Sequence, residues 1–110
     1  MMILVGIGGF FGALTRFTIG KYIVSAYPWA TFIINCSGSF ALGYVYGCQP
    51  IEWLWQLVGI GFLGAYTTFS TFGFEVMQLL EKQRKTHAMI YIFSSVIIGI
   101  LGAALGLFLA

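Results

Sequence analysis

The sequence predicts an all-α membrane protein in which four apolar helices form a single domain over residues 1–110. Hydrophobic residues make up 60% of the chain, and charged residues make up only 7%, whereas roughly a quarter of the residues in a soluble domain are charged. A small domain leaves much of its area exposed, so a soluble fold of this length could not hide so much apolar surface. The surroundings that fit this composition are lipid.

Four stretches have about the 20 mostly apolar residues that a membrane helix needs. They are residues 3–24, 29–47, 53–80 and 88–109. Short proline-containing or polar segments separate them: 25–28, 49–52 and 81–87. The chain begins with apolar residues and has no basic segment before them, so we interpret the first stretch as a retained span and not as a signal peptide.

The third stretch predicts a break near its centre. It is about 28 residues long, and residues 61–73 are rich in glycine and hydroxyl side chains, which weaken a helix. Carbonyl groups freed by a break in the membrane need a partner. Two interpretations are open: a kink whose carbonyls accept from threonine hydroxyls, or a site for an ion.

Polar side chains recur at helical spacing inside the apolar stretches, where each is costly. Asn35 lies near the middle of the second stretch. Interhelical hydrogen bonding and an ion route both explain such residues. The lines are Thr31, Asn35 and Ser39; Thr68, Thr71 and Glu75; and Tyr91 and Ser95, with Phe69 and Phe72 beside the second.

Arg16 and the glycines also need an account. Arg16 lies deep in the first stretch, where it either extends toward the interface or faces a water-filled vestibule. Small residues four apart let membrane helices approach closely. Such pairs are Gly8 with Gly12, Ser39 with Gly43, and Gly102 with Gly106.

The sequence offers little for an enzyme. It has no Asp, and its acids are Glu52, Glu75 and Glu81. The single histidine, His87, falls in the expected loop 81–87. No nucleophile–base pair or acid pair is visible, so we predict a protein that is not an enzyme. Cys36 and Cys48 lack the spacing of a metal site.

Three motifs resemble those of a known family. Residues 8–16 read GGFFGALTR, residues 35–40 read NCSGSF, and residues 64–72 read GAYTTFSTF. Together they are similar to the GGxxGAxxR, NxxGSF and GxxTTFSTF signatures of the Fluc/CrcB fluoride channels. The length and the four-span layout match as well, so the resemblance covers essentially the whole chain.

The resemblance implies a passive fluoride channel that exports fluoride from the cytoplasm and lowers its toxicity. It implies an antiparallel dimer with a central structural sodium ion, held here by the carbonyls of Gly64 and Thr67. A hydroxyl expected one turn after Ser95 is replaced by Gly99. The residues implied for the fluoride pathway are Asn35, Phe69, Phe72, Ser70, Thr71, Glu75, Tyr91, Ser95 and Arg16.

Two other functions are open. A small four-helix multidrug/proton antiporter needs a carboxylate in the membrane, typically in its first span, and residues 3–24 contain no acid. A non-conducting subunit of a heterodimeric channel is disfavoured only by the completeness of the three motifs.

The distribution of basic residues bears on the partner subunit and on the membrane. With four spans, Lys21, Lys82, Arg84 and Lys85 lie on one side of the bilayer, and the other side has no Lys or Arg. The positive-inside rule places the first side in the cytoplasm of a cell inner or plasma membrane. An antiparallel dimer then favours a differently biased paralogue as partner, with a homodimer as the alternative.

Overall fold

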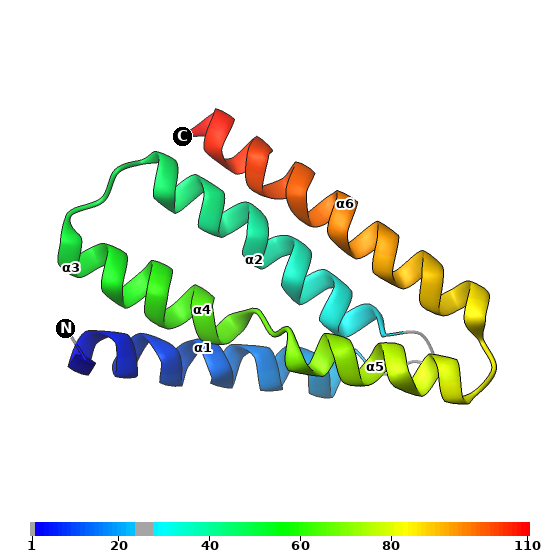
Figure 1. Cartoon of the computed structure of the whole chain (residues 1–110). Coiled ribbons are helices and arrows are strands. Elements are labelled where there is room, and N and C mark those ends of the chain that lie inside the picture. Colours follow the sequence, from blue (N-terminus) through cyan, green and yellow to red (C-terminus); the bar gives the residue numbers. More distant parts are fainter. Residues whose placement is uncertain (1, 24–27) are drawn as a thin grey trace.

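The computed structural model of the chain describes residues 2–23 and 28–110. Residue 24 of the first predicted span and residues 25–27 of the predicted turn lie outside the described residues. The helical elements are α1 (Met2–Tyr22), α2 (Trp29–Gly47), α3 (Glu52–Leu54), η1 (Trp55–Leu63), α4 (Gly64–Tyr66), α5 (Ser70–Glu81) and α6 (Lys85–Leu109). Elements α3 to α5 follow one another as a single interrupted rod (Figure 1).

Three helices within the described residues are long and apolar enough to cross a membrane: Met2–Tyr22, Glu52–Glu81 and Lys85–Leu109. The second predicted span, 29–47, has the same bounds as α2. α2 carries Thr31, Asn35 and Ser39, and these polar residues lower its hydropathy. All three side chains are buried or half-buried, so α2 directs polar groups toward the other helices.

The helices pair along their lengths in two sets. α2 lies beside α6, and α1 lies beside η1 and α4, with the two members of each pair running in the same direction (Figure 1). Glycines mark the closest approaches. A Cβ atom on Gly12 would overlap the carbonyl oxygen of Phe62, and one on Gly106 would overlap that of Phe40. Backbone therefore packs directly on backbone in both pairs, which suits association in lipid.

We expect Gly12→Ala to destabilise the protein by roughly 1–3 kcal/mol, because α1 would have to move away from Phe62. The measurement is the thermal midpoint of the purified protein in detergent. Gly20→Ala is the matched control, since a Cβ atom there meets nothing within 4 Å on the same helix. Equal midpoints for the two variants would contradict the close packing of α1 on η1.

η1 is a π-helix of 9 residues, which the sequence analysis did not foresee. A π-helical turn is wider than an α-helical turn and is uncommon over more than a few residues. Gly59 and Gly61 are buried within it, and a Cβ atom on Gly61 would lie 2.7 Å from the carbonyl oxygen of Val5. The wide turn, and the absence of side chains at Gly59 and Gly61, bring the interrupted rod α3–α5 close to α1.

The predicted polar loop 81–87 is too long. α5 ends through Gln83, whose φ of 57° is left-handed. The Arg84 N–H donates to the Leu79 carbonyl at 2.9 Å, and the Gln83 N–H donates to the Leu80 carbonyl at 3.0 Å, which is the Schellman pattern of a helix end. The chain re-enters a helix at Lys85. His87 therefore lies in the first turn of α6 and not in a loop.

Candidate functional site

The break in the third rod lies between α4 and α5, at residues 67–69. Thr67 has an extended backbone with φ −77° and ψ 153°, which ends α4. A continuous helix would direct the N–H groups of Thr68 and Thr71 to the carbonyls of Gly64 and Thr67, four residues earlier. Instead the Thr68 N–H donates to Asn35 Oδ1 at 2.9 Å, and the Thr71 N–H donates to Thr68 Oγ1 at 3.3 Å.

The Thr67 hydroxyl bonds to a carbonyl other than those of Gly64 and Thr67. Thr67 Oγ1 donates to the Leu63 carbonyl at 3.0 Å, and the Thr67 N–H donates to the same oxygen at 3.1 Å. The kink interpretation, in which a carbonyl accepts from a threonine hydroxyl, therefore applies to the Leu63 carbonyl. The donors that a continuous helix would give to Gly64 and Thr67 are directed elsewhere, so these two carbonyl oxygens remain candidates for an ion.

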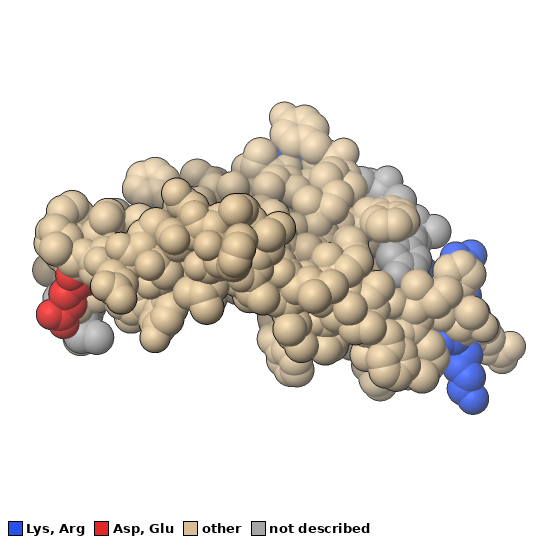
Figure 2. All heavy atoms as spheres, turned by 90° about the horizontal axis from the view of Figure 1, so that it is seen from above, with Lys and Arg blue, Asp and Glu red and all other residues tan. Residues whose placement is uncertain are grey.

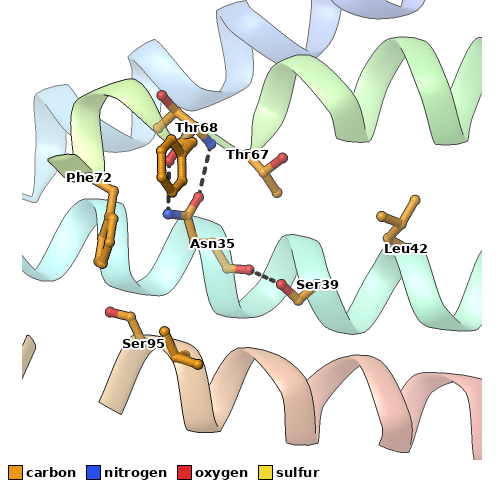
Figure 3. Close-up of a pocket in the computed structure, with 9 residues that line it drawn as sticks. Asn35, Ser39, Leu42, Thr67, Thr68, Phe72 and Ser95 are labelled. Atoms are coloured by element: carbon orange, nitrogen blue, oxygen red, sulfur yellow. Dashed lines mark hydrogen bonds between the residues drawn. The ribbon is translucent and has the colours of Figure 1, made fainter. Parts of the chain in front are cut away.

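Asn35 holds the break from α2. Its Oδ1 accepts from the Thr68 N–H, and its Nδ2 donates to the Thr68 carbonyl at 3.0 Å (Figure 3). Ser39 Oγ donates in turn to the Asn35 main-chain carbonyl at 2.7 Å. The Asn35 amide thus replaces the hydrogen bonds that the broken backbone lacks, and one N–H of its NH2 group has no partner among the described residues.

Two further residues of α2 support the break. Ser37 Oγ and Tyr66 Oη lie 3.0 Å apart and form a hydrogen bond. Gly38 is buried, and a Cβ atom there would overlap Cγ2 of Thr67. Residues 35–38 of α2 therefore contact residues 66–68 on each side of the point where the helix opens.

A cavity of about 320 Å³ lies along this contact. It draws on α2, the break, α5 and α6, and it brings together Asn35, Phe69, Phe72 and Ser95 (Figure 3). The lining residues are Asn35, Ser39, Leu42, Thr67, Thr68, Phe69, Phe72, Ser95 and Val96. Polar groups from three segments far apart in the sequence thus meet in one place.

The aromatic and hydroxyl groups of this cavity have distinct surroundings. The ring centroids of Phe69 and Phe72 are 6.2 Å apart, and the Phe69 side chain is 85% exposed. The Ser95 hydroxyl is buried and has no hydrogen-bond partner within the part of the chain that the structure describes. A buried hydroxyl of this kind is a donor available to a ligand.

Tyr91 and Glu75 lie beside this cavity and not in its lining. The Tyr91 hydroxyl donates to Glu75 Oε1 at 3.1 Å, and the Tyr91 ring centroid is 4.9 Å from that of Phe72. Tyr91 is fully buried. Tyr91 therefore packs against Phe72 and donates to Glu75 in this structure.

A second cavity, of about 460 Å³, lies between α1, α2 and the start of α5. Arg16 and Lys21 of α1 line it together with Thr31 of α2. Arg16 thus lines a cavity between helices. Thr68 and Thr71 line the same cavity. Ser70 begins α5, but its side chain lies outside the description.

Sequence reasoning missed the central position of Thr68. The residue belongs to one of the polar lines but was not assigned to the pathway, and Lys21 was counted only among the basic residues on one side of the bilayer. Thr68 lines both cavities. The pair of adjacent threonines, 67 and 68, was a signal, because one side chain bonds back along the helix and the other forward across the break.

Comparisons with known proteins identify the family of this chain. The family model described as "CrcB-like protein, Camphor Resistance (CrcB)" matches residues 3–107. "Fluoride-specific ion channel FluC 2" of Clostridium acetobutylicum is 48% identical over 97% of this chain and 95% of that protein.

Two further relatives are similar over their length. A protein of Bacillus cereus with the same name is 46% identical over 96% of this chain and 92% of that protein. "Fluoride-specific ion channel FluC 1" of Carboxydothermus hydrogenoformans is 40% identical over 99% of this chain and 92% of that protein. These names describe ion channels and not enzymes. With a family model covering nearly all its residues, this chain belongs to the CrcB family.

Proposed function

We propose that this chain is a passive fluoride channel of a cell inner or plasma membrane, which exports fluoride and lowers its toxicity. The observation that carries the proposal is the cavity at the break, where an amide, a free hydroxyl and two phenyl rings converge. The relatives named as fluoride-specific channels supply the choice of ion.

The chemistry of the cavity suits a small anion. Fluoride binds water strongly, so a route through the membrane must offer replacement donors. Asn35 has a spare N–H, and Ser95 has an unpartnered hydroxyl. The edges of Phe69 and Phe72 carry partial positive charge. None of these groups is a fixed charge, so the ion is held weakly enough to leave.

The second cavity provides an approach for the ion. Arg16 and Lys21 raise the local concentration of anions there, and Thr71 offers a hydroxyl. The members of the proposed fluoride pathway are Asn35, Phe69, Phe72, Ser70, Thr71, Glu75, Tyr91, Ser95 and Arg16.

The proposed channel is an antiparallel dimer in which α2 also crosses the membrane. Phe69 is 85% exposed although it borders the cavity that Asn35 and Ser95 also line. A second subunit against this face would cover the ring and close the cavity.

The charge distribution favours a paralogue as that second subunit. The visible basic atoms gather mainly at the end where α5 meets α6, and the visible acidic atoms lie at the opposite end (Figure 2). Lys82, Arg84 and Lys85 are exposed there. A chain with this bias inserts in one orientation. Relatives carry the names FluC 1 and FluC 2, and these numbers indicate that the family includes paralogues.

We expect accessibility tags on the two termini to report one orientation when this chain is expressed alone, with both termini outside the cytoplasm. Fluoride flux should then need a partner chain of opposite charge bias. The control is a variant with Lys21, Lys82, Arg84 and Lys85 all replaced by Gln, which has no charge bias between the two sides and should insert both ways. If the tags of the unmodified chain are found on both sides of the membrane and flux is full, the chain forms a homodimer.

A sodium ion at the dimer centre fits the residues present. Sodium is a hard cation that prefers oxygen ligands, and the Gly64 and Thr67 carbonyls have lost their helical donors to Asn35 and Thr68. These two carbonyls from each subunit would hold the ion. When bound, it would join the two broken rods and offset nearby negative charge.

We expect removal of sodium to lower fluoride flux and thermal stability together, because the carbonyls would then repel one another across the dimer. Protein purified in N-methylglucamine salts, with sodium checked by atomic emission, is compared before and after sodium is restored. Recovery with sodium but not with N-methylglucamine supports the site. Unchanged flux and stability in sodium-free protein would rule out the proposed sodium site.

Fluoride efflux from proteoliposomes tests the function. Liposomes that contain this chain together with a paralogue, loaded with potassium fluoride and treated with valinomycin, should release fluoride, as read by a selective electrode, with no proton gradient and no drug cation present. Efflux that depends on proton or drug counter-transport would instead indicate the antiporter. No efflux from the chain alone, with efflux restored by a paralogue, would indicate a subunit of a heterodimer.

A further inference from the structure

Thr68 stands between the two cavities of the site. It lines the cavity that contains Phe69 and Phe72, and it also lines the one that contains Arg16 and Lys21. Its exposed fraction is 9%. We propose that Thr68 is a positioning residue of the ion route, whose hydroxyl makes Thr71 a hydrogen-bond donor toward the cationic cavity. This proposal rests on the proposed fluoride function.

The direction of the hydrogen bonds carries this proposal. The Thr71 N–H donates to Thr68 Oγ1, so that oxygen acts as acceptor, and the Thr68 hydroxyl proton is directed at Thr71 Oγ1, 3.3 Å away. A threonine hydroxyl has one proton and two lone pairs. Since Thr71 Oγ1 accepts from Thr68, its own proton is free to point elsewhere.

The Thr71 hydroxyl proton can point into a defined cavity. The Thr71 side chain is exposed and lines the cavity with Arg16 and Lys21. An anion drawn there by the two cations therefore meets a hydroxyl donor beside the break. Without Thr68, the Thr71 hydroxyl would be free to turn back and donate to a main-chain carbonyl, as Thr15 and Thr18 do in α1.

Thr68 is itself held in place from the other cavity. Both of its main-chain polar groups bond to the Asn35 amide, at 2.9 Å and 3.0 Å (Figure 3). Asn35, Thr68 and Thr71 thus form one connected chain of hydrogen bonds from the aromatic cavity to the cationic cavity. A single residue orients donors on both sides of the break.

A purely structural role for Thr68 would give a different experimental result from a positioning role. A hydroxyl that only stabilised the start of α5 would change how many channels fold, and each folded channel would conduct normally. A positioning residue changes the conductance of each channel and its permeability ratio for fluoride over chloride. Single-channel recording in planar bilayers separates the two, since it does not depend on the number of folded molecules.

The experiment compares Thr68→Val, which keeps the shape and removes the hydroxyl, with Thr68→Ser, which keeps the hydroxyl. We expect Thr68→Val to lower unitary fluoride conductance roughly tenfold, the loss typical of a hydrogen-bond donor to a charged group. Thr68→Ser should conduct within about twofold of the unmodified channel, the smaller effect that we assign to a retained hydrogen bond. Thr18→Val, on the exposed face of α1, is the matched control and should change nothing.

Thr71→Val gives an independent arm if Thr68→Val yields no folded protein. It removes the oriented donor itself, so it should lower unitary conductance as Thr68→Val does, and the double variant should be no worse than either single one. Normal unitary conductance in Thr68→Val or in Thr71→Val would overturn the proposal, and so would equal losses in Thr68→Ser and Thr68→Val. An unmodified chain that fails to conduct fluoride, alone or with a paralogue, would instead remove the proposed function.

Discussion

Asn35→Asp is expected to reduce fluoride flux by roughly a thousandfold, because a carboxylate near the ion repels it by about 4 kcal/mol at 4 Å in a medium of intermediate dielectric. The change also removes the donor to the Thr68 carbonyl and places a carboxylate oxygen against that carbonyl. The measurement is fluoride efflux from proteoliposomes, normalised to the amount of folded dimer found by size exclusion.

Asn35→Leu separates the charge from the hydrogen bonds. Leucine is similar in size to asparagine and makes neither bond to Thr68, so it loosens the break without adding charge. We expect its flux to lie between those of Asn35→Asp and the unmodified protein. If the Asp and Leu variants conduct equally, Asn35 supports the break but does not face the ion.

Phe69→Ile is expected to lower flux by roughly tenfold to a hundredfold, if the ring edge is worth as much to the anion as a hydrogen bond to a charged group. Phe69 is 85% exposed, so its replacement removes little packing within the subunit. Phe72→Ile should have a similar effect on flux and should also lower stability, because Phe72 packs against the fully buried Tyr91.

Phe108→Ile is the matched control for Phe69. Phe108 is 83% exposed and lies near the end of α6, away from either cavity. Its replacement should leave flux unchanged. Normal flux in both Phe69→Ile and Phe72→Ile would return the two rings to a packing role.

The membrane helices were predictable because their signal is local. Composition and apolar length identify a span without knowledge of its neighbours, and the bounds of α2 coincide with the predicted range 29–47. The break was expected within residues 61–73 for the same reason, since glycine and hydroxyl residues weaken a helix wherever they cluster.

Local pattern alone could not give the position of the break within residues 61–73, because tertiary contacts decide it. The Asn35 amide captures the Thr68 N–H from 33 residues away, and no local pattern announces that bond. The π-helical form of η1 also depends on the packing of its backbone against α1. At Gly8 of α1 the two backbones are so close that a Cβ atom would not fit. The error at residues 85–87 arose because their polarity was interpreted as a loop, although α6 begins at Lys85.

The reversal potential of single channels in a planar bilayer tests passive fluoride conduction most directly. With a tenfold fluoride gradient and equal chloride on both sides, we predict a reversal potential close to the fluoride equilibrium value, about 59 mV for a monovalent ion. The unmodified protein is recorded at two pH values, alone and with a paralogue. A potential near zero, or one that follows the proton gradient, would contradict a fluoride-selective channel.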